Sequence, residues 1–193
     1  MRKIILASSS PRRKELLEKL KIPFTVLASN IDEILDASLT PKEQVESLSR
    51  QKAHATAQLD GAQNALIIAG DSMVFIGNQL LGKPKDADDA IRMLQLLRGN
   101  PHDILTGFTI LDTVTGHEVT SSSRTTLWFR DISDDEIKRF VEQEKPYDKA
   151  GAYGMQEIGA IFIEKLEGDY MGGIGLPLFP LAKELRNFGV TIL

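Results

Sequence analysis

The chain has 193 residues, of which 42% are hydrophobic and 26% charged, and this composition is that of an ordinary globular protein. Its formal net charge of −4 argues against broad binding to nucleic acid or to an acidic membrane surface, so positive charge must act locally. The absence of cysteine excludes disulfides, thiolate zinc sites and a cysteine nucleophile.

The length and the N-terminus bear on domain organisation and location. The chain is long enough for one well-buried core, which predicts a single domain over residues 1–193, and two lobes sharing a cleft would also fit this length. Met1–Lys3 leads straight into a short apolar strand, and no apolar run approaches the roughly 18 residues of a membrane span. We therefore expect a cytoplasmic protein with no membrane partner.

The first elements of the chain predict a strand, a tight turn and a helix. The apolar run Ile4–Leu6 is followed by the hydroxyl-rich Ser8–Ser10, and Ser10 and Pro11 suit the N-cap and the first helical position. A helix that begins this way directs free backbone N–H groups and a partial positive charge at whatever lies above the turn. An anion fits there.

Three consecutive cations, Arg12, Arg13 and Lys14, occupy the first turn of this helix. A helix N-terminus prefers acidic residues by roughly 0.3–1 kcal/mol each, so the cations are locally unfavourable unless an anionic ligand reverses the effect. A solvated basic face on an amphipathic helix explains them equally well. Phosphate recognition therefore needs support from the rest of the chain.

The next elements place two charged side chains on predicted core elements. A strand over Pro23–Ala28 and a polar loop precede a capping box at Thr40, which predicts a helix to about Leu59 with Lys52 on its inward face. The continuous apolar run Ala65–Ala69 predicts a central strand buried on both faces. Asp71 follows after Gly70, and a carboxylate at the edge of such a run is costly unless it is satisfied.

The remainder of the chain alternates between strand and helix patterns. Its patterns predict a mixed α/β fold with both hairpin and crossover connections. In order, they are a helix capped by Asp86 and stopped at 99–101, strands over 103–112 and 118–130 forming a hairpin, a helix from Ser133 to about Glu144, a shaped loop over 145–156, a strand over 160–166, a glycine-rich approach over 172–177 to the final helix, and an edge strand over 190–193.

A set of polar side chains at element ends and in loops suits a polyphosphate. Arginine forks clamp phosphate oxygens, lysines place point charges, and carboxylates hold a divalent ion or polarise water. The set comprises Ser8, Arg12, Arg13, Glu33, Lys52, Asp71, Lys83, Lys149 and Gln156.

Several other chemistries lack their sequence signatures. There is no phosphate loop of the Gly-x-x-x-x-Gly-Lys-Ser/Thr type and no Gly-x-Ser-x-Gly elbow, and the glycines of 172–175 match a dinucleotide fingerprint poorly. His54, His102 and His117 lie far apart without ligands nearby in sequence, so we expect packing or surface roles for them. From the residues alone we favour a phosphate-handling enzyme and leave its substrate open.

Five motifs together resemble the Maf family of nucleoside triphosphate pyrophosphatases, and they cover essentially the whole chain in the family's order. They are SSSPRRKELL (8–17), GDS (70–72), GKP (82–84), DKAGAYGMQ (148–156) and GLPL (175–178). The resemblance implies an elongated twisted sheet flanked by helices with a central cleft, related in fold to inosine triphosphate pyrophosphatases. It also implies hydrolysis of a nucleoside triphosphate to the monophosphate and pyrophosphate with a divalent metal, Mg²⁺ or Mn²⁺.

The resemblance also implies roles for single residues. Asp71 matches the family's proton acceptor, and we expect it to bind or face the metal together with Glu33. Together with the polar set above, this predicts a substrate-binding set of Ser8, Arg12, Arg13, Lys52, Ser72, Lys83, Lys149 and Gln156, in which Arg13, Lys52, Lys83 and the N-terminal turn hold the triphosphate.

Three of these positions differ between branches of the family. Arginine at Arg12 and glutamine at Gln156 resemble the branch that takes dTTP and UTP more than the branch that takes 7-methyl-GTP. Ser72 departs from the threonine usual in the pyrimidine branch, keeping the hydroxyl but losing a methyl group. Base preference is therefore less firmly implied than the reaction, and modified pyrimidine nucleotides stay open as substrates.

Other interpretations of these residues remain open at this point. Asp71 could be a satisfied turn residue, and Glu33, Lys52 and Lys83 could be solvated side chains. We expect Tyr153 to pack against its loop rather than stack on a base. The family is also associated with septum formation, so a nucleotide-sensing regulator of cell division with little turnover is the alternative function. The oligomeric state, including a homodimer, also stays open.

Overall fold

The computed structural model describes residues 2–192, and within it the chain divides into two compact units. The first unit contains the residues up to Ser72, residues 106–123 and the residues from Gly175 onward, and the second contains residues 73–105 and 124–174. Strands β3 (Ala65–Ile76), β5 (Pro101–Asp112) and β6 (Glu118–Phe129) contribute residues to both units. A single domain over the whole chain stays a prediction.

The described strands form one mixed sheet with the order β2-β1-β3-β5-β6-β7, and β4 pairs with β3. In the first unit, β1 (Lys3–Leu6) lies between β2 (Thr25–Val26) and β3 and is parallel to both. In the second unit, β4 (Gln79–Leu81) is antiparallel to β3, and β7 (Ile163–Gly168) is antiparallel to β6. The predicted mixed α/β class, a sheet flanked by helices, is confirmed.

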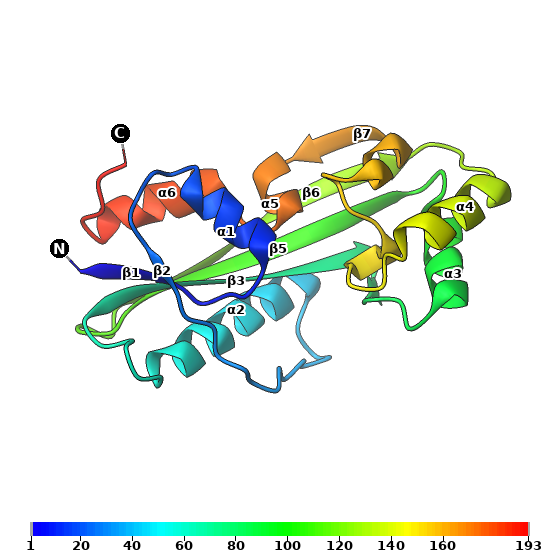
Figure 1. Cartoon of the computed structure of the whole chain (residues 1–193). Coiled ribbons are helices and arrows are strands. Elements are labelled where there is room, and N and C mark those ends of the chain that lie inside the picture. The colour runs from blue at the N-terminus through cyan, green and yellow to red at the C-terminus, as the bar shows by residue number, and fades with distance from the viewer. Residues whose placement is uncertain (1, 193) are drawn as a thin grey trace. The chain divides into compact units, whose positions relative to one another are not determined.

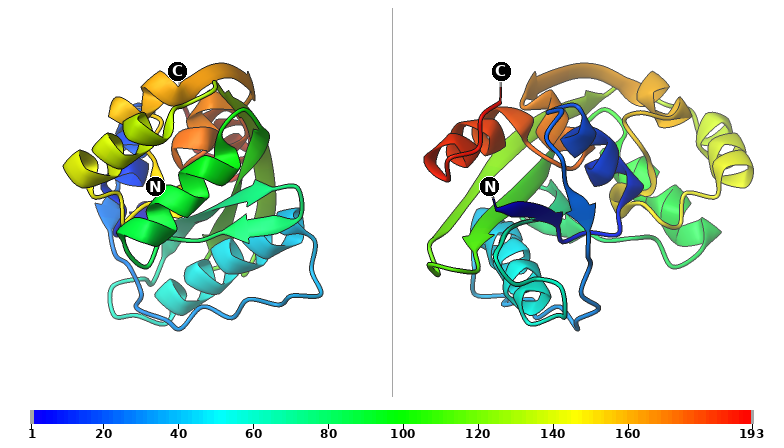
Figure 2. Two further views of the ribbon diagram at one scale, coloured as in Figure 1. Left: turned by 90° about the vertical axis from the view of Figure 1, so that its right-hand side faces the viewer. Right: turned by 60° about the vertical axis from the view of Figure 1, so that its left-hand side comes forward.

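In the first unit, helices cover both faces of the sheet. The long α2 (Pro41–Ala57) lies along one face, and α1 (Pro11–Glu18) and α6 (Leu178–Asn187) lie on the other (Figures 1 and 2). The face under α2 is lined by alternate residues of β3, namely Ala65, Ile67 and Ala69, which form a buried cluster with Ala53 of α2. This alternation follows from the two-residue period of a strand.

Helix α2 approaches the sheet closely at Gly107 of β5. A Cβ atom on Gly107 would lie 2.6 Å from the carbonyl carbon of Val45 and 2.9 Å from the backbone nitrogen of Glu46. Both of these are backbone atoms of the helix, so they could yield only if α2 shifted. Glycine at this position therefore lets α2 lie against β5.

A chain of hydroxyl groups continues the contact between α2 and the sheet. Ser49 bonds Thr109 at 2.8 Å, and Thr109 bonds Thr120 of β6 at 2.9 Å. Ser49 and Thr109 are buried, and their mutual hydrogen bond offsets the cost of taking them out of water. The helix that carries Lys52 is thus fixed both by packing and by polar contacts.

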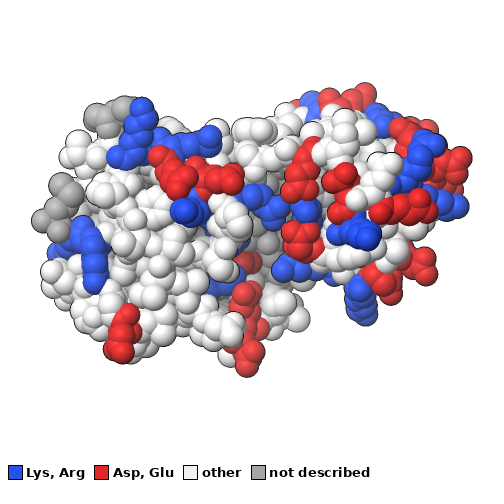
Figure 3. Space-filling model, viewed as in Figure 1, with Lys and Arg blue, Asp and Glu red and all other residues white. Residues whose placement is uncertain are grey.

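The second unit has its own hydrophobic core, which includes Leu94 of α3, Phe140 of α4 and Phe162. Charged side chains of both signs are interspersed over its outer helices α3 and α4 (Figure 3), including the Arg92–Asp89 pair at 2.7 Å. The elements of this unit outside the shared strands are β4, α3 (Ala87–Leu97), α4 (Asp134–Glu144), the 3₁₀ helices η1 (Ala150–Ala152) and η2 (Ile158–Phe162), β7 and α5 (Tyr170–Ile174).

A buried histidine lies in this second core. The Nε2 atom of His102 is 2.6 Å from the hydroxyl of Tyr153, and the ring of Phe129 packs edge-on against the imidazole at 4.8 Å. Burial lowers the pKa of His102 to about 4. The predicted packing roles of His102 and Tyr153 agree with these contacts.

The predicted helix starts are confirmed. Thr40 and Ser133 form complete capping boxes with Glu43 and Glu136, and Asp86 caps α3. Helix α2 ends at Ala57, two residues before the predicted end. Strand β2 is shorter than the predicted strand over 23–28, and it includes only Thr25–Val26.

Three predictions in the C-terminal part of the chain are wrong. The first part of the predicted strand 160–166 is the 3₁₀ helix η2, and β7 begins only at Ile163. The predicted glycine-rich approach over 172–177 begins inside a separate helix, α5, because the Asp169 side chain caps the N–H of Gly172 at 3.0 Å. Residues 190–192 form no strand, since the N–H of Val190 bonds the carbonyl of Leu185 and so closes helix α6; Leu193 lies outside the described residues.

Among residues 2–192, no helix is both long enough and apolar enough to cross a membrane.

The contact at Gly107 predicts that Gly107→Ala destabilises the protein. The added methyl group meets helix backbone, so we expect the free energy of unfolding to fall by about 1–3 kcal/mol. Urea denaturation would measure this. Gly82→Ala is the matched control, because a Cβ on Gly82 meets nothing within 4 Å. Equal midpoints for the two variants would contradict the close approach of α2.

The depressed pKa of His102 predicts a loss of stability in acid. The folded protein resists protonating His102 until about pH 4, whereas the unfolded chain takes up that proton near pH 6.5. Between these values the unfolded state binds more protons, so the free energy of unfolding falls as the pH falls, by at most about 1.4 kcal/mol per pH unit from this group. Urea denaturation from pH 7 to pH 4 should show a shallower slope for His102→Gln than for the native chain. Identical slopes would show that His102 does not titrate in this way.

Candidate active site

The N-terminus of α1 has the predicted local structure. Ser10 is the N-cap with extended backbone angles, its hydroxyl accepts from the N–H of Arg13, and Pro11 occupies the first turn. The N–H of Ser10 in turn donates to the hydroxyl of Ser8 at 3.2 Å. The hydroxyl-rich turn therefore serves to begin the helix directly after β1.

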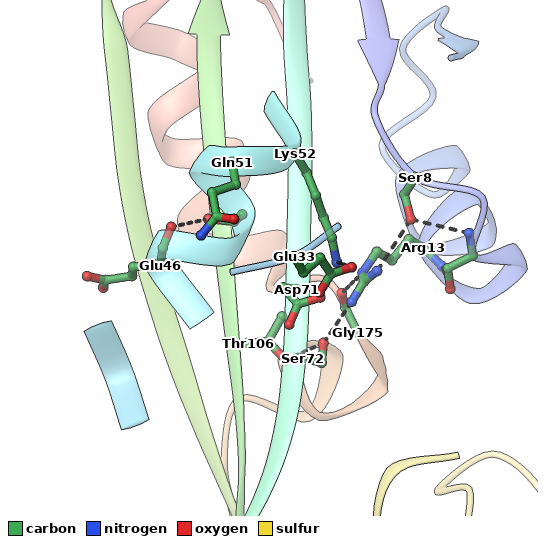
Figure 4. A network of polar contacts seen from close by, with 12 residues as sticks. Ser8, Arg13, Glu33, Glu46, Gln51, Lys52, Asp71, Ser72, Thr106 and Gly175 are labelled. Carbon is green, nitrogen blue, oxygen red and sulfur yellow. Dashed lines mark hydrogen bonds and ion pairs between the residues drawn. The ribbon is translucent and has the colours of Figure 1, made fainter. Parts of the chain in front are cut away.

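Arg13 points into the first unit rather than onto a solvated face. Its Nε donates to the carbonyl of Gly175 at 3.0 Å, and its two terminal nitrogens donate to the hydroxyls of Ser8 at 3.4 Å and Ser72 at 3.3 Å (Figure 4). All three partners are neutral oxygen atoms. Burial lowers the pKa of Arg13, while the negative charges of Asp71 and Glu33 oppose this effect.

Asp71 is a buried carboxylate, with 8% of its surface exposed, and Lys52 of α2 satisfies it. The Nζ atom of Lys52 binds Oδ1 of Asp71 and lies 3.0 Å from Oε1 of Glu33. One ammonium group thus joins the middle of the buried strand β3 to the loop that precedes α2. Figure 4 shows Lys52 reaching from α2 to both carboxylates.

The alternation of β3 explains how Asp71 and Ser72 reach different helices. Asp71 continues the series Ala65, Ile67, Ala69 on the face under α2, where Lys52 is found. Ser72 points to the opposite face, where α1 supplies Arg13. Two consecutive residues of β3 therefore contact cationic side chains on opposite faces of the sheet.

The two carboxylates are suitable oxygen donors for a hard divalent cation. Mg²⁺ is commonly held by one or two carboxylates together with water and substrate phosphates. Glu33 and Asp71 already converge on a cationic nitrogen, so their placement fits such an ion. Across residues 2–192, no group of three or more His, Asp or Glu side chains is arranged to hold a metal by itself.

The structure brings together six of the residues singled out in the sequence. They are Ser8, Arg13, Glu33, Lys52, Asp71 and Ser72, all in the first unit. Arg12 is half-buried in the first turn of α1. Asp71 lies within β3 and pairs with Lys52, so Asp71 is not a turn residue and Lys52 is not a solvated surface lysine.

Three predicted residues belong to the second unit. Lys83 and Gln156 are exposed, on the connector after β4 and on the loop after η1. The Nζ of Lys149 lies 2.7 Å from Asp148 and 3.2 Å from Glu157, so its charge is balanced within its own loop. Desolvation alone would lower the pKa of Lys149, but the hydrogen bonds to these carboxylates outweigh it and raise the pKa.

Sequence reasoning missed three residues that hold this site in place. Thr106 donates to the hydroxyl of Ser72 at 2.9 Å, the carbonyl of Gly175 accepts from Arg13, and Gln51 bonds the backbone next to Glu33. Of the three, only Gly175 stands out in the sequence, as the first residue of the GLPL motif. In the structure its φ of +141° favours glycine. Nothing in the local sequence distinguishes Thr106 or Gln51 from any other polar residue.

The arrangement unites the parts of a phosphate-handling site. A buried carboxylate can accept a proton, and a buried guanidinium beside a helix N-terminus can bind an anion. Two carboxylate oxygens nearby suit a divalent ion.

Comparisons with known proteins agree with this chemistry. A dTTP/UTP pyrophosphatase of Alkaliphilus oremlandii is 44% identical over 195 residues, covering 100% of both chains. Relatives of the same name are 41% identical in Acetivibrio thermocellus, covering 100% of this chain and 98% of that protein, and 44% identical in Methanosarcina barkeri, covering 100% and 97%. The family model described as Maf-like protein matches residues 3–188, and the chain therefore belongs to the Maf family.

Proposed function

We propose that this chain is a nucleoside triphosphate pyrophosphatase that hydrolyses dTTP and UTP to the monophosphate and pyrophosphate. The observation that carries the proposal is the buried Asp71 carboxylate, held by Lys52 beside the inward-facing Arg13. The relatives named dTTP/UTP pyrophosphatase match the whole chain at 41–44% identity and supply the substrate.

Asp71 is the proposed proton acceptor. A water oxygen attacks the α-phosphorus, its proton passes to the Asp71 carboxylate, and the bond from the α-phosphorus to the bridging oxygen breaks to release pyrophosphate. Lys52 fixes the orientation of the carboxylate through Oδ1. This leaves the second oxygen of Asp71 to face the water.

Arg13 is the proposed phosphate ligand of the first unit. Its hydrogen bonds to Ser8, Ser72 and Gly175 hold the guanidinium without neutralising its charge. An anionic oxygen would supply the missing charge, and it would also lie at the positive end of the α1 dipole. Fixed positive groups of this kind stabilise the charge that develops in the transition state.

Glu33 and Asp71 are the proposed ligands of a divalent metal, Mg²⁺ or Mn²⁺. When bound, such an ion polarises the phosphoryl oxygen and helps to neutralise the triphosphate. Glu33 is the more exposed of the two carboxylates and lies on a loop, whereas Asp71 is fixed in a strand. The chain thus offers one oxygen donor on a strand and one on a loop.

Arg12, Ser72 and Gln156 are proposed to set the base preference for pyrimidines, and Lys83 and Lys149 are proposed to bind substrate. These roles rest on the family resemblance. The Ser72 hydroxyl already takes part in hydrogen bonds with Thr106 and Arg13, so it is held in one orientation. Such an orientation is what a hydroxyl needs to discriminate between ligands.

Incubation with a panel of nucleoside triphosphates tests this function. With Mg²⁺ or Mn²⁺ we expect pyrophosphate release, fastest from dTTP and UTP, and little release from 7-methyl-GTP. Chelation of the metal should abolish the release. Binding of nucleotide without pyrophosphate release would instead support a nucleotide sensor, and release of orthophosphate would contradict the proposed bond cleavage.

Replacing the proposed proton acceptor should remove turnover but not folding. We expect Asp71→Asn to reduce the rate of pyrophosphate release by about two orders of magnitude or more, because the amide cannot accept the proton. Asp60→Asn, at an exposed position, is the control and should retain full activity. A single-turnover assay and circular dichroism measure the two effects. Retained activity in Asp71→Asn would remove Asp71 from this role.

A further inference from the structure

The loop that carries Glu33 has no secondary structure and exposes apolar side chains next to Glu33. Residues 27–36 contain no helix or strand. The apolar side chains of Ile34 and Leu35 are 73% and 52% exposed, so hydrophobic burial does not anchor this part of the loop. The ion pair of Glu33 with Lys52 is half-exposed at its carboxylate and is by itself a weak tether.

Gln51 of α2 binds both backbone polar groups of Ile34. The N–H of Ile34 donates to Oε1 of Gln51 at 3.0 Å, and Nε2 of Gln51 donates to the carbonyl of Ile34 at 2.9 Å. Nε2 also lies 3.3 Å from the hydroxyl of Ser47. The donor and acceptor pattern fixes the orientation of the amide, since a flipped amide would oppose like groups at both positions.

The two hydrogen bonds between Gln51 and Ile34, which we call the Gln51 clamp, lie next to the Glu33–Lys52 ion pair in both the loop and the helix. Ile34 follows Glu33 in the loop, and Lys52 follows Gln51 in the helix. The pairs Ile34–Gln51 and Glu33–Lys52 therefore form two neighbouring contacts between the same two stretches of chain. The first contact is directional and made with the backbone, so it fixes where the second can form.

We propose that Gln51 is a positioning residue that holds the Glu33 carboxylate beside Lys52 and Asp71. Gln51 touches neither carboxylate and acts only through the backbone of Ile34. This inference rests on the proposed function, because its consequence is that Gln51 sets the Mg²⁺ concentration that pyrophosphate release requires. Loss of a group that orients a metal ligand typically costs 10–100-fold in metal affinity or activity.

Gln51→Ala separates this role from general stability. We expect the amide of Ile34 to exchange its hydrogen about tenfold faster in the free protein, measured by NMR, because both hydrogen bonds of the clamp are lost. We expect the Mg²⁺ concentration for half-maximal pyrophosphate release to rise about tenfold. Excess Mg²⁺ should restore most of the turnover. Gln51→Glu, which keeps an acceptor for the Ile34 N–H but loses the donor, should give intermediate values.

Gln44→Ala is the matched control. Gln44 is also a glutamine of α2 that donates to a loop carbonyl, that of Leu39 at 3.0 Å, but it lies away from Glu33. It should leave both the Ile34 exchange rate and the Mg²⁺ dependence unchanged.

Each result has a definite meaning for the proposal. Unchanged exchange at Ile34 in Gln51→Ala, unchanged Mg²⁺ dependence, or an equal shift in Gln44→Ala would each overturn it. A native chain that releases no pyrophosphate would overturn the proposed function itself, and the functional consequence of the clamp with it. Activity in the native chain with no effect of Gln51→Ala would overturn only the role of Gln51.

Discussion

The ion pair between Lys52 and Asp71 is the contact on which the site depends. Both side chains are largely buried, and burying two charges costs several kcal/mol per ion, roughly, before their attraction offsets it. Such a pair adds little net stability, yet it links α2 directly to β3. The pair suits the proposed role of Asp71 as proton acceptor, because Lys52 keeps this carboxylate in one orientation within the buried strand β3.

The close packing of α2 serves the same end. Gly107 admits the helix backbone to β5, and the hydroxyl contacts of Ser49 and Thr109 hold it there. A lysine side chain is flexible, so it can place its ammonium group accurately only if its helix does not move and its far end is held by partners. Packing against β5 therefore holds the helix that carries Lys52, and the carboxylates of Asp71 and Glu33 hold its ammonium group.

Local signals explain which elements could be predicted from the sequence. The capping box at Thr40, the N-cap at Ser10 and the apolar run before Asp71 are each determined by neighbouring residues, and the structure has all three. The edge strand predicted over 190–193 is absent from residues 190–192, because the N–H of Val190 closes the preceding helix, which the β-branched residues do not reveal. The Gln51 clamp could not be predicted, since it joins residues 17 apart and depends on where an irregular loop passes.

Arg13 and Lys52 show why the basic residues of the site are not equivalent. The ammonium of Lys52 is balanced by two carboxylates, so it has little charge left for a phosphate. The guanidinium of Arg13 is buried among neutral oxygens, an arrangement that costs free energy in the absence of an anion. A site that pairs one cation with carboxylates and hydrogen-bonds the other to neutral oxygens suits the two roles proposed above, in which Lys52 orients the Asp71 carboxylate and Arg13 binds phosphate. Of the three cations at the start of α1, which the helix dipole disfavours, Arg13 is understandable on this basis, whereas Lys14 lies 3.7 Å from Glu18 of the same helix.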